Sequence, residues 1–154
     1  ELPTETVDLL PLAQEAAENL RAAAEVKNVS IIVSGENVPV TGVRRLLYEI
    51  AYNLCDNAIK YNVDGGSVDV RVGAEGGSAC LTVRDTGIGI PPEHQSRIFE
   101  RFYRVDKSHS KASGGTGLGL SIVKHAVAYH HGTIALKSEV GKGTEITVRF
   151  PQEK

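Results

Sequence analysis

The sequence contains no Met and no Trp, only two Cys, and 3 Phe and 5 Tyr. Its charges nearly cancel, since the net charge is −2 at pH 7. This balance lacks the basic excess of proteins that bind nucleic acid or anionic membranes, so we expect no nucleic-acid partner. No apolar run approaches the roughly 20 residues that span a bilayer, and the N-terminus lacks a signal-peptide pattern. We therefore expect no direct membrane insertion by these residues.

The two cysteines are poor candidates for metal ligands. Cys55 and Cys80 stand in periodic apolar segments without CxxC or CxxH spacing, which favours buried thiols and a reducing compartment. Because the chain has no Met and begins at Glu1, we expect a segment of a longer polypeptide. Its 154 residues, 41% of them hydrophobic, suit one domain over residues 1–154.

Hydrophobic periodicity predicts a chain that mixes helices and strands. Helices are expected at residues 12–24, 43–61 and 118–131, with Gly132 as the left-handed stop of the last, and a shorter helix at 92–103. Strands are expected as two hairpins, 67–72 with 79–85 and 133–139 with 145–150, and as short extended pieces at 5–10, 29–33 and 38–40. Each hairpin alternates polar and apolar residues, so helices should cover one face only.

The longest stretch with little regular structure runs from Asp85 to Thr116. Loops of this length are uncommon inside compact domains, and they often carry binding functions. The functional surface is therefore expected here.

The helix predicted at 43–61 carries a polar stripe. At 100° per residue, five polar side chains fall within about 100° of one another. They are Glu49, Asn53, Asp56, Asn57 and Lys60. Asn is a poor helix former, and its amide oxygen suits a hard cation such as Mg²⁺. The stripe is therefore either a cation site or a solvated helix face.

The segment RDTGIGIPP combines an acidic side chain with two glycines. Asp85 ends a predicted strand, and Gly87 and Gly89 leave the backbone open to a flat ligand. The carboxylate would accept a hydrogen bond from an exocyclic amine. An ordinary Asx turn is the alternative interpretation.

The segment SGGTGLGLSIVKH, residues 113–125, fits neither the Walker A nor the dinucleotide-binding pattern. Successive glycines before a helix expose backbone N–H groups at its positive end, which favours an anion site. The same glycines also suit a hinge.

The segment RIFERFYRVDKSHSKAS contains both aromatic and basic side chains. Phe99, Phe102 and Tyr103 stand at helical spacing and would dock a short helix. Its arginines would reach a terminal phosphate or remain solvated. They are Arg97, Arg101 and Arg104.

Five motifs occur in a fixed order: NLCDNAIKYN, DTGIGI, FERFYRVD, GTGLGLSIV and GKGTEITV. They resemble the N, G1, F and G2 boxes and the last glycine motif of the catalytic and ATP-binding domain of two-component sensor histidine kinases. That domain is of the Bergerat type shared with gyrase, Hsp90 and MutL. The resemblance implies a two-layer α/β sandwich: a mixed sheet of about five strands, three helices on one face, and a long ATP lid.

The resemblance also implies roles for individual residues. Asn57, with help from Asn53, would coordinate Mg²⁺ between the phosphates of ATP, and Asp85 would bind the adenine amino group. Arg104 would contact the γ-phosphate and join the two asparagines as a catalytic residue. The other implied nucleotide-binding residues are Lys60, Tyr61, Gly87, Gly89, Ile90, Tyr103, Gly115, Thr116, Gly117, Leu118, Gly119 and Thr144. The lid, residues 107–115, is expected to be mobile until nucleotide binds.

The phosphoacceptor of such a kinase is missing from the chain, because none of the 5 His stands in the expected His-acidic pattern. The resemblance implies a partner dimerisation domain that carries this histidine, and a response regulator that acts after it. It further implies a cytoplasmic domain of a membrane-anchored kinase. We expect the isolated chain to be monomeric.

Three other functions remain open from the sequence. A hydrolase of the gyrase, Hsp90 or MutL kind uses a Glu one turn before the metal-binding Asn, where this chain has Asn53, which cannot act as a general base. A serine kinase of the anti-sigma type shares the nucleotide pocket. A nucleotide-binding scaffold without catalysis is the third.

Overall fold

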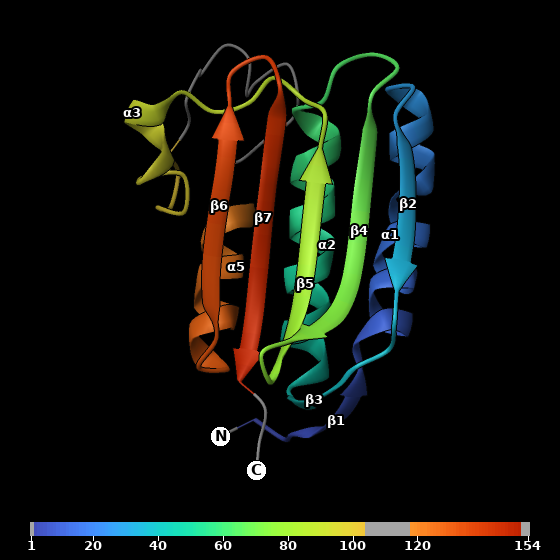
Figure 1. Ribbon diagram of the computed structural model, residues 1–154, viewed down its shortest axis with the longest axis vertical. Coiled ribbons are helices and arrows are strands. Elements are labelled where there is room, and N and C mark those ends of the chain that lie inside the picture. The colour runs from blue at the N-terminus through green and yellow to red at the C-terminus, as the bar shows by residue number, and fades with distance from the viewer. Residues whose placement is uncertain (1, 104–117, 152–154) are drawn as a thin grey trace.

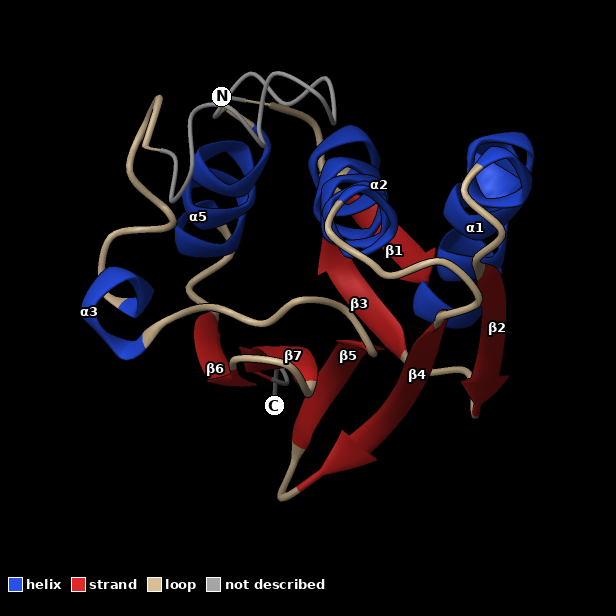
Figure 2. Ribbon diagram, turned by 90° about the horizontal axis from the view of Figure 1, so that it is seen from above, coloured by secondary structure: helices blue, strands red, loops and turns tan. Residues whose placement is uncertain are grey.

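The computed structural model describes residues 2–103 and 118–151, and it has two layers. A five-stranded sheet forms one layer, and helices α1, α2 and α5 lie together against one of its faces (Figure 2). The short helix α3 lies beside the outer strand β6. The predicted α/β sandwich with a mixed sheet and three covering helices is confirmed.

The sheet has the strand order β2-β4-β5-β7-β6 (Figure 1). Its strands are β2 (Ser30–Gly35), β4 (Ser67–Glu75), β5 (Ser78–Asp85), β7 (Gly143–Pro151) and β6 (Thr133–Glu139). Strand β2 runs parallel to β4, and the other neighbours are antiparallel. A separate ribbon pairs β1 (Glu5–Asp8) with β3 (Pro39–Gly42). The helices are α1 (Leu9–Val26), α2 (Arg44–Lys60), α3 (Pro92–Gln95) and α5 (Gly119–Tyr129).

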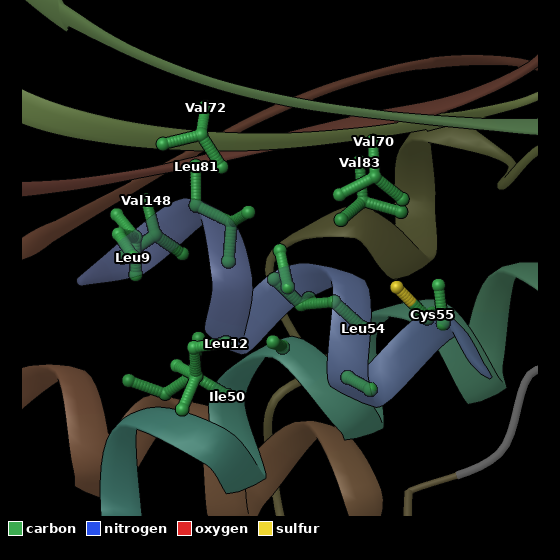
Figure 3. Packing of buried hydrophobic residues seen from close by; sticks show 14 of the residues in the cluster. Leu9, Leu12, Ile50, Leu54, Cys55, Val70, Val72, Leu81, Val83 and Val148 are labelled. Atoms are coloured by element: carbon green, nitrogen blue, oxygen red, sulfur yellow. The ribbon is translucent and has the colours of Figure 1, made fainter. Parts of the chain in front are cut away.

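The core lies between the sheet and the helices. Alternate residues of β4 turn inward, so Val70 is fully buried whereas Arg71 faces solvent. Figure 3 shows side chains of α1 and α2 packed toward this inner face, with Leu54 and Cys55 below Val70 and Val83. The Cys55 thiol is fully buried, and this burial, with the neighbouring Asp56 charge, raises its pKa to about 12. Both cysteines are buried and unpaired, as the sequence predicted.

Helix α1 begins at Leu9, three residues before the predicted start. Pro11 lies in the first turn, where a missing N–H removes no intrahelical hydrogen bond. The free N–H groups of Leu9 and Leu10 instead donate to Val38 O (3.1 Å) and Asn37 Oδ1 (3.2 Å). Contacts from a distant segment therefore fix a start that helical periodicity alone does not reveal.

The prediction that Gly132 is the left-handed residue at the end of α5 was wrong. His131, not Gly132, takes the left-handed conformation, with φ of 58°. The N–H of Gly132 donates to Val127 O (2.9 Å) and that of His131 to Ala128 O (3.0 Å), which is the Schellman pattern. Gly132 is still needed, because a Cβ there would lie 2.6 Å from Arg149 O.

The helix predicted at 92–103 was also too long, since α3 ends at Gln95. Isolated three-residue turns follow it, such as Tyr103 N–H to Glu100 O (3.2 Å). Phe102 has φ of 64°, which a continuing right-handed helix excludes. No helix of the described residues is long and apolar enough to cross a membrane.

Candidate functional site

The candidate residues gather at one end of the sheet (Figure 1). Helix α2 ends just before β4 begins, and β5 runs antiparallel to β4, so its last residue Asp85 pairs with Val68. Asp85 also pairs with Thr144 at the start of β7. Helix α5 begins at this same end. Segments far apart in the sequence therefore form one polar border.

The N-terminus of α5 lies directly against the polar stripe of α2. The Asn53 amide donates back to Glu49 O (2.8 Å), and its Oδ1 faces α5. A Cβ on Gly119 would lie 3.2 Å from that oxygen, so a side chain there would crowd it. Asn57 is partly buried on the same stripe. The structure thus brings together the asparagine helix and the last glycine of the GTGLG segment.

Lys60 is already engaged at the end of α2. Its Nζ lies 3.0 Å from Asp56 Oδ2, and both side chains are partly buried. Its carbonyl oxygen accepts a hydrogen bond from Lys27 Nζ (2.6 Å). An anion that recruits Lys60 therefore has to compete with Asp56.

Asp85 is the most strongly perturbed acid of the site. Its Oδ1 accepts hydrogen bonds from the N–H groups of Gly87 (2.8 Å) and Thr144 (3.2 Å). Burial raises its pKa to about 6, although these two bonds oppose the shift. Within residues 2–103 and 118–151, no donor bonds the second oxygen, Oδ2. The carboxylate is thus oriented through one oxygen, and the other has no donor among the described residues.

The loop after Asp85 packs too closely for side chains at its glycines. A Cβ on Gly87 would overlap Tyr61 O, and one on Gly89, whose φ is 75°, would overlap Glu139 O. Ile88 bridges both neighbours, since its N–H donates to Tyr61 O (3.1 Å) and its carbonyl accepts from Gly141 N–H (2.9 Å). The glycines therefore serve backbone packing, a role that the sequence pattern did not predict, and the ligand access that it did predict stays a prediction.

Two residues that the sequence analysis missed hold the far side of this loop. The Ser138 hydroxyl accepts from Ile90 N–H (2.8 Å) and lies 2.8 Å from Thr144 Oγ1. Gln95 donates to Ile90 O (2.8 Å) and Ser138 O (3.2 Å), which ties α3 to the loop. Neither residue belongs to a motif, and the bonds that join Ser138 to Ile90 and to Gln95 span 48 and 43 residues, so no local signal marks them.

Tyr103 is held by neighbours from its own segment. Its hydroxyl meets His94 Nδ1, and the Arg97 guanidinium lies 4.5 Å above its ring. Arg97 also pairs with Glu100 (3.1 Å), while Arg101 stacks on Phe102. Two of the three arginines expected to reach a phosphate thus have local partners, and the third, Arg104, lies outside the described residues.

Residues 42–154 match the family of histidine kinase-, DNA gyrase B- and HSP90-like ATPases. The chain belongs to this ATPase family. The Bergerat fold inferred from its five motifs is thereby confirmed.

Within the ATPase family, its relatives are sensor histidine kinases. It is 41% identical over 149 residues to the sensor-like histidine kinase SenX3 of Mycolicibacterium smegmatis, covering 96% of this chain and 39% of the relative. It is 42% identical over 144 residues to the sensor histidine kinase RppB of a Synechocystis species, covering 94% and 32%. The chain therefore spans 32% to 39% of the length of these relatives.

Solved structures give the same fold. The mycobacterial sensor histidine kinase MprB superposes with a TM-score of 0.83 and 31% identity over 97% of both chains. Full-length ShkA in complex with AMPPNP superposes with a TM-score of 0.85 and 30% identity, covering 98% of this chain and 31% of ShkA. The fold of this ATPase is that of histidine kinase catalytic domains.

The ATPase fold collects most of the predicted site residues at one end. Those at the border described above are Asn53, Asn57, Lys60, Tyr61, Asp85, Gly87, Gly89, Ile90, Leu118, Gly119 and Thr144. Tyr103 ends the described segment before the gap. Arg104, Gly115, Thr116, Gly117 and the lid at 107–115 lie outside the described residues.

Proposed function

We propose that this domain binds Mg²⁺-ATP and donates the γ-phosphoryl group to a histidine on a separate dimerisation domain. The observation that carries the proposal is the Asp85 carboxylate, fixed through Oδ1 at the start of a loop that bonds Tyr61 at the end of α2. Its relatives are named sensor histidine kinases, and the similar ShkA structure holds AMPPNP. Asp85 Oδ2 accepts a hydrogen bond from the adenine amino group, and the glycine loop accommodates the flat base.

The metal would be held by amide oxygens. Asn53 and Asn57 lie one turn apart on the same face of α2, and neutral oxygens suit Mg²⁺ when phosphates supply the charge. Among the described residues no cluster of three or more His, Cys, Asp or Glu offers a fully protein-built site. The ion would neutralise charge on the transferred phosphoryl group. Lys60 would exchange Asp56 for a phosphate oxygen.

The geometry favours transfer over hydrolysis. A hydrolase of this family needs a carboxylate at the position of Asn53, whose amide instead donates to Glu49 O (2.8 Å). Glu49 itself lies a further turn away and faces Arg45 (3.6 Å). No described group on the stripe is thus placed to deprotonate water one turn before Asn57.

We further propose the setting of the domain. Residues 1–154 form one domain, monomeric when isolated, on the cytoplasmic side of a membrane-anchored kinase. Its direct partner is the dimerisation domain that carries the phosphoacceptor histidine, and a response regulator receives the phosphoryl group from that histidine.

Radiolabelled ATP tests the reaction. With Mg²⁺-ATP alone the chain should bind nucleotide without labelling itself, and the parent's dimerisation domain supplied in trans should acquire acid-labile label. Transfer should be weaker than in the intact kinase because the tether is missing. Acid-stable label on this chain would instead indicate a serine kinase, and rapid phosphate release a hydrolase.

Asp85→Ala tests the adenine assignment, with the exposed Asp69→Ala on the open face of the sheet as control. Loss of an oriented acceptor should weaken ADP binding about a hundredfold, so that GDP and ADP bind alike. Titration calorimetry of both nucleotides measures this. Unchanged discrimination in Asp85→Ala would reduce the carboxylate to a turn residue.

A further inference from the structure

One buried side chain next to the site has no role in the proposed chemistry. Asn62 follows the end of α2, and its residue is only 7% exposed. Its Nδ2 donates to Ala58 O (3.1 Å) and Ser67 O (3.0 Å), and its Oδ1 accepts from Val63 N–H (2.8 Å). The hydroxyl of Thr86, 3.1 Å away, donates to the same Oδ1. Both amide protons and both acceptor positions are thus used.

Thr86 extends the connection to β4. Its Oγ1 accepts from the N–H of Ser67 (2.9 Å) while it donates to Asn62. The Thr86 backbone N–H donates to Ser67 O (3.2 Å), so both its backbone and its side chain bond the first residue of β4. A Cβ on Gly66 would overlap Asn62 Oδ1 and lie 2.7 Å from Thr86 Oγ1, so only glycine leaves room for this pair.

The pair joins the two halves of the candidate site. On one side it bonds the carbonyl of Ala58, which lies in the last turn of α2 between Asn57 and Lys60. On the other side Thr86 directly follows Asp85. Besides this pair, the bond from Ile88 N–H to Tyr61 O (3.1 Å) links the same two segments.

We propose that the Asn62–Thr86 hydrogen bond is a positioning device that fixes the spacing between the end of α2 and Asp85. The inference depends on the proposed nucleotide site. A ligand that engages both halves at once gains affinity only when their spacing matches its length, because the second contact is then made without further ordering. Neither side chain touches the nucleotide, so each acts through Asp85 and the α2 stripe.

The proposal distinguishes long ligands from short ones. ADP with Mg²⁺ would contact both halves, whereas adenosine would contact only the Asp85 half. Loosening the pair should therefore weaken ADP more than adenosine. A purely structural loss would lower the thermal midpoint and leave the ratio of the two dissociation constants unchanged.

Thr86→Val removes the hydroxyl with little change in shape, and Thr86→Ser restores it. Thr82→Val is the matched control on β5, the strand that Thr86 follows, since the Thr82 hydroxyl bonds Thr147 Oγ1 (3.2 Å) on the open face of the sheet. Calorimetry for ADP and NMR titration for adenosine should be run well below the thermal midpoint of each variant. Thr86→Ala replaces the valine variant if circular dichroism shows that it does not fold.

We expect Thr86→Val to weaken ADP binding about fivefold to tenfold and adenosine by no more than about twofold. Thr86→Ser should return both values to those of the unmodified chain, and Thr82→Val should change neither. Equal weakening of both ligands, unchanged ADP binding in Thr86→Val, or no rescue by serine would overturn the positioning role. Failure of the unmodified chain to bind ADP would overturn the proposed function itself.

Discussion

The two sides of the candidate site are held in different ways. On the Asp85 side, each residue from Asp85 to Ile90 except Gly89 has a hydrogen bond to another segment or to the next turn, and most of these bonds involve the backbone. On the Tyr103 side, Ile98 is buried and Phe99 packs against the core, but the polar contacts of Arg97, Arg101 and Tyr103 join neighbours within residues 94–103, and the Arg97–Glu100 pair is about half exposed. The Asp85 side is therefore bonded into the sheet, whereas the polar side chains of residues 97–103 rest on short-range surface contacts.

Of the changes that test this comparison, Gly143→Ala on the Asp85 side is expected to have the largest effect. Gly143 has φ of 111°, and a Cβ there would overlap Asp85 O, so alanine has to push β7 away from β5. We expect a loss of at least about 3 kcal/mol in the free energy of unfolding. Urea denaturation measures it.

The matched control is Gly141→Ala in the same turn. Gly141 also has a positive φ, 82°, but a Cβ there meets nothing within 4 Å. It should cost only about 1 kcal/mol for the backbone conformation. Equal losses in the free energy of unfolding for both variants would mean that the cost of Gly143→Ala comes from backbone strain and not from contact with Asp85.

A smaller effect is expected from pH on the Asp85 side. Because the folded-state pKa of Asp85 is about 6, protons compete with an amine donor below that pH. ADP affinity should be constant above pH 7 and fall about tenfold by pH 5. Calorimetry across this range measures it, and in Asp85→Asn the remaining weak binding should lose this dependence.

The stability of the free domain should depend on pH in the opposite direction to ADP affinity. The pKa of Asp85 is raised above its ordinary value of 3.8, so the folded state holds this proton more tightly than the unfolded chain does. Its contribution to stability is present below about pH 4 and is lost as the pH rises through about 6. A flat ADP affinity between pH 7 and 5 would argue against both effects.

The smallest effect is expected from Arg97→Ala on the Tyr103 side. Exposed ion pairs contribute little, so the thermal midpoint should move by less than about 2 °C. Differential scanning calorimetry measures it, with Lys142→Ala, which removes another exposed i,i+3 pair with Glu139, as control. A shift several times larger than that of Lys142→Ala would show that the Tyr103 side is held as firmly as the Asp85 side.

The sequence predicted those features of the sheet and of the site that depend on the residue pattern of a single segment. Alternation in β4 and β5, and helical spacing in α2, depend on one segment at a time, so the inner faces were correctly assigned. The order of the motifs along the chain identified the family, and the fold of that family places Asp85, Asn53 and Gly119 at one border.

What the sequence left out depends on contacts between distant segments. Helix α1 begins at Leu9 because the N–H of Leu9 donates to Val38 O and that of Leu10 to Asn37 Oδ1. Ser138 matters because its hydroxyl accepts from Ile90 N–H. The end of α5 was misassigned because glycine is the usual left-handed residue, whereas here His131 takes that conformation and Gly132 makes room for Arg149 O.

Because Cys55 is buried between α2 and the sheet, its rate of chemical modification measures how often α2 separates from the sheet. The thiol is fully buried, and its pKa of about 12 leaves almost no thiolate at neutral pH. An alkylating reagent can therefore modify it only during the moments when α2 separates from the strands. Asn53 and Asn57 lie two residues before and after Cys55 on that helix. The rate at which the Cys55 thiol is labelled therefore reports how often the part of α2 where the phosphates are proposed to bind opens.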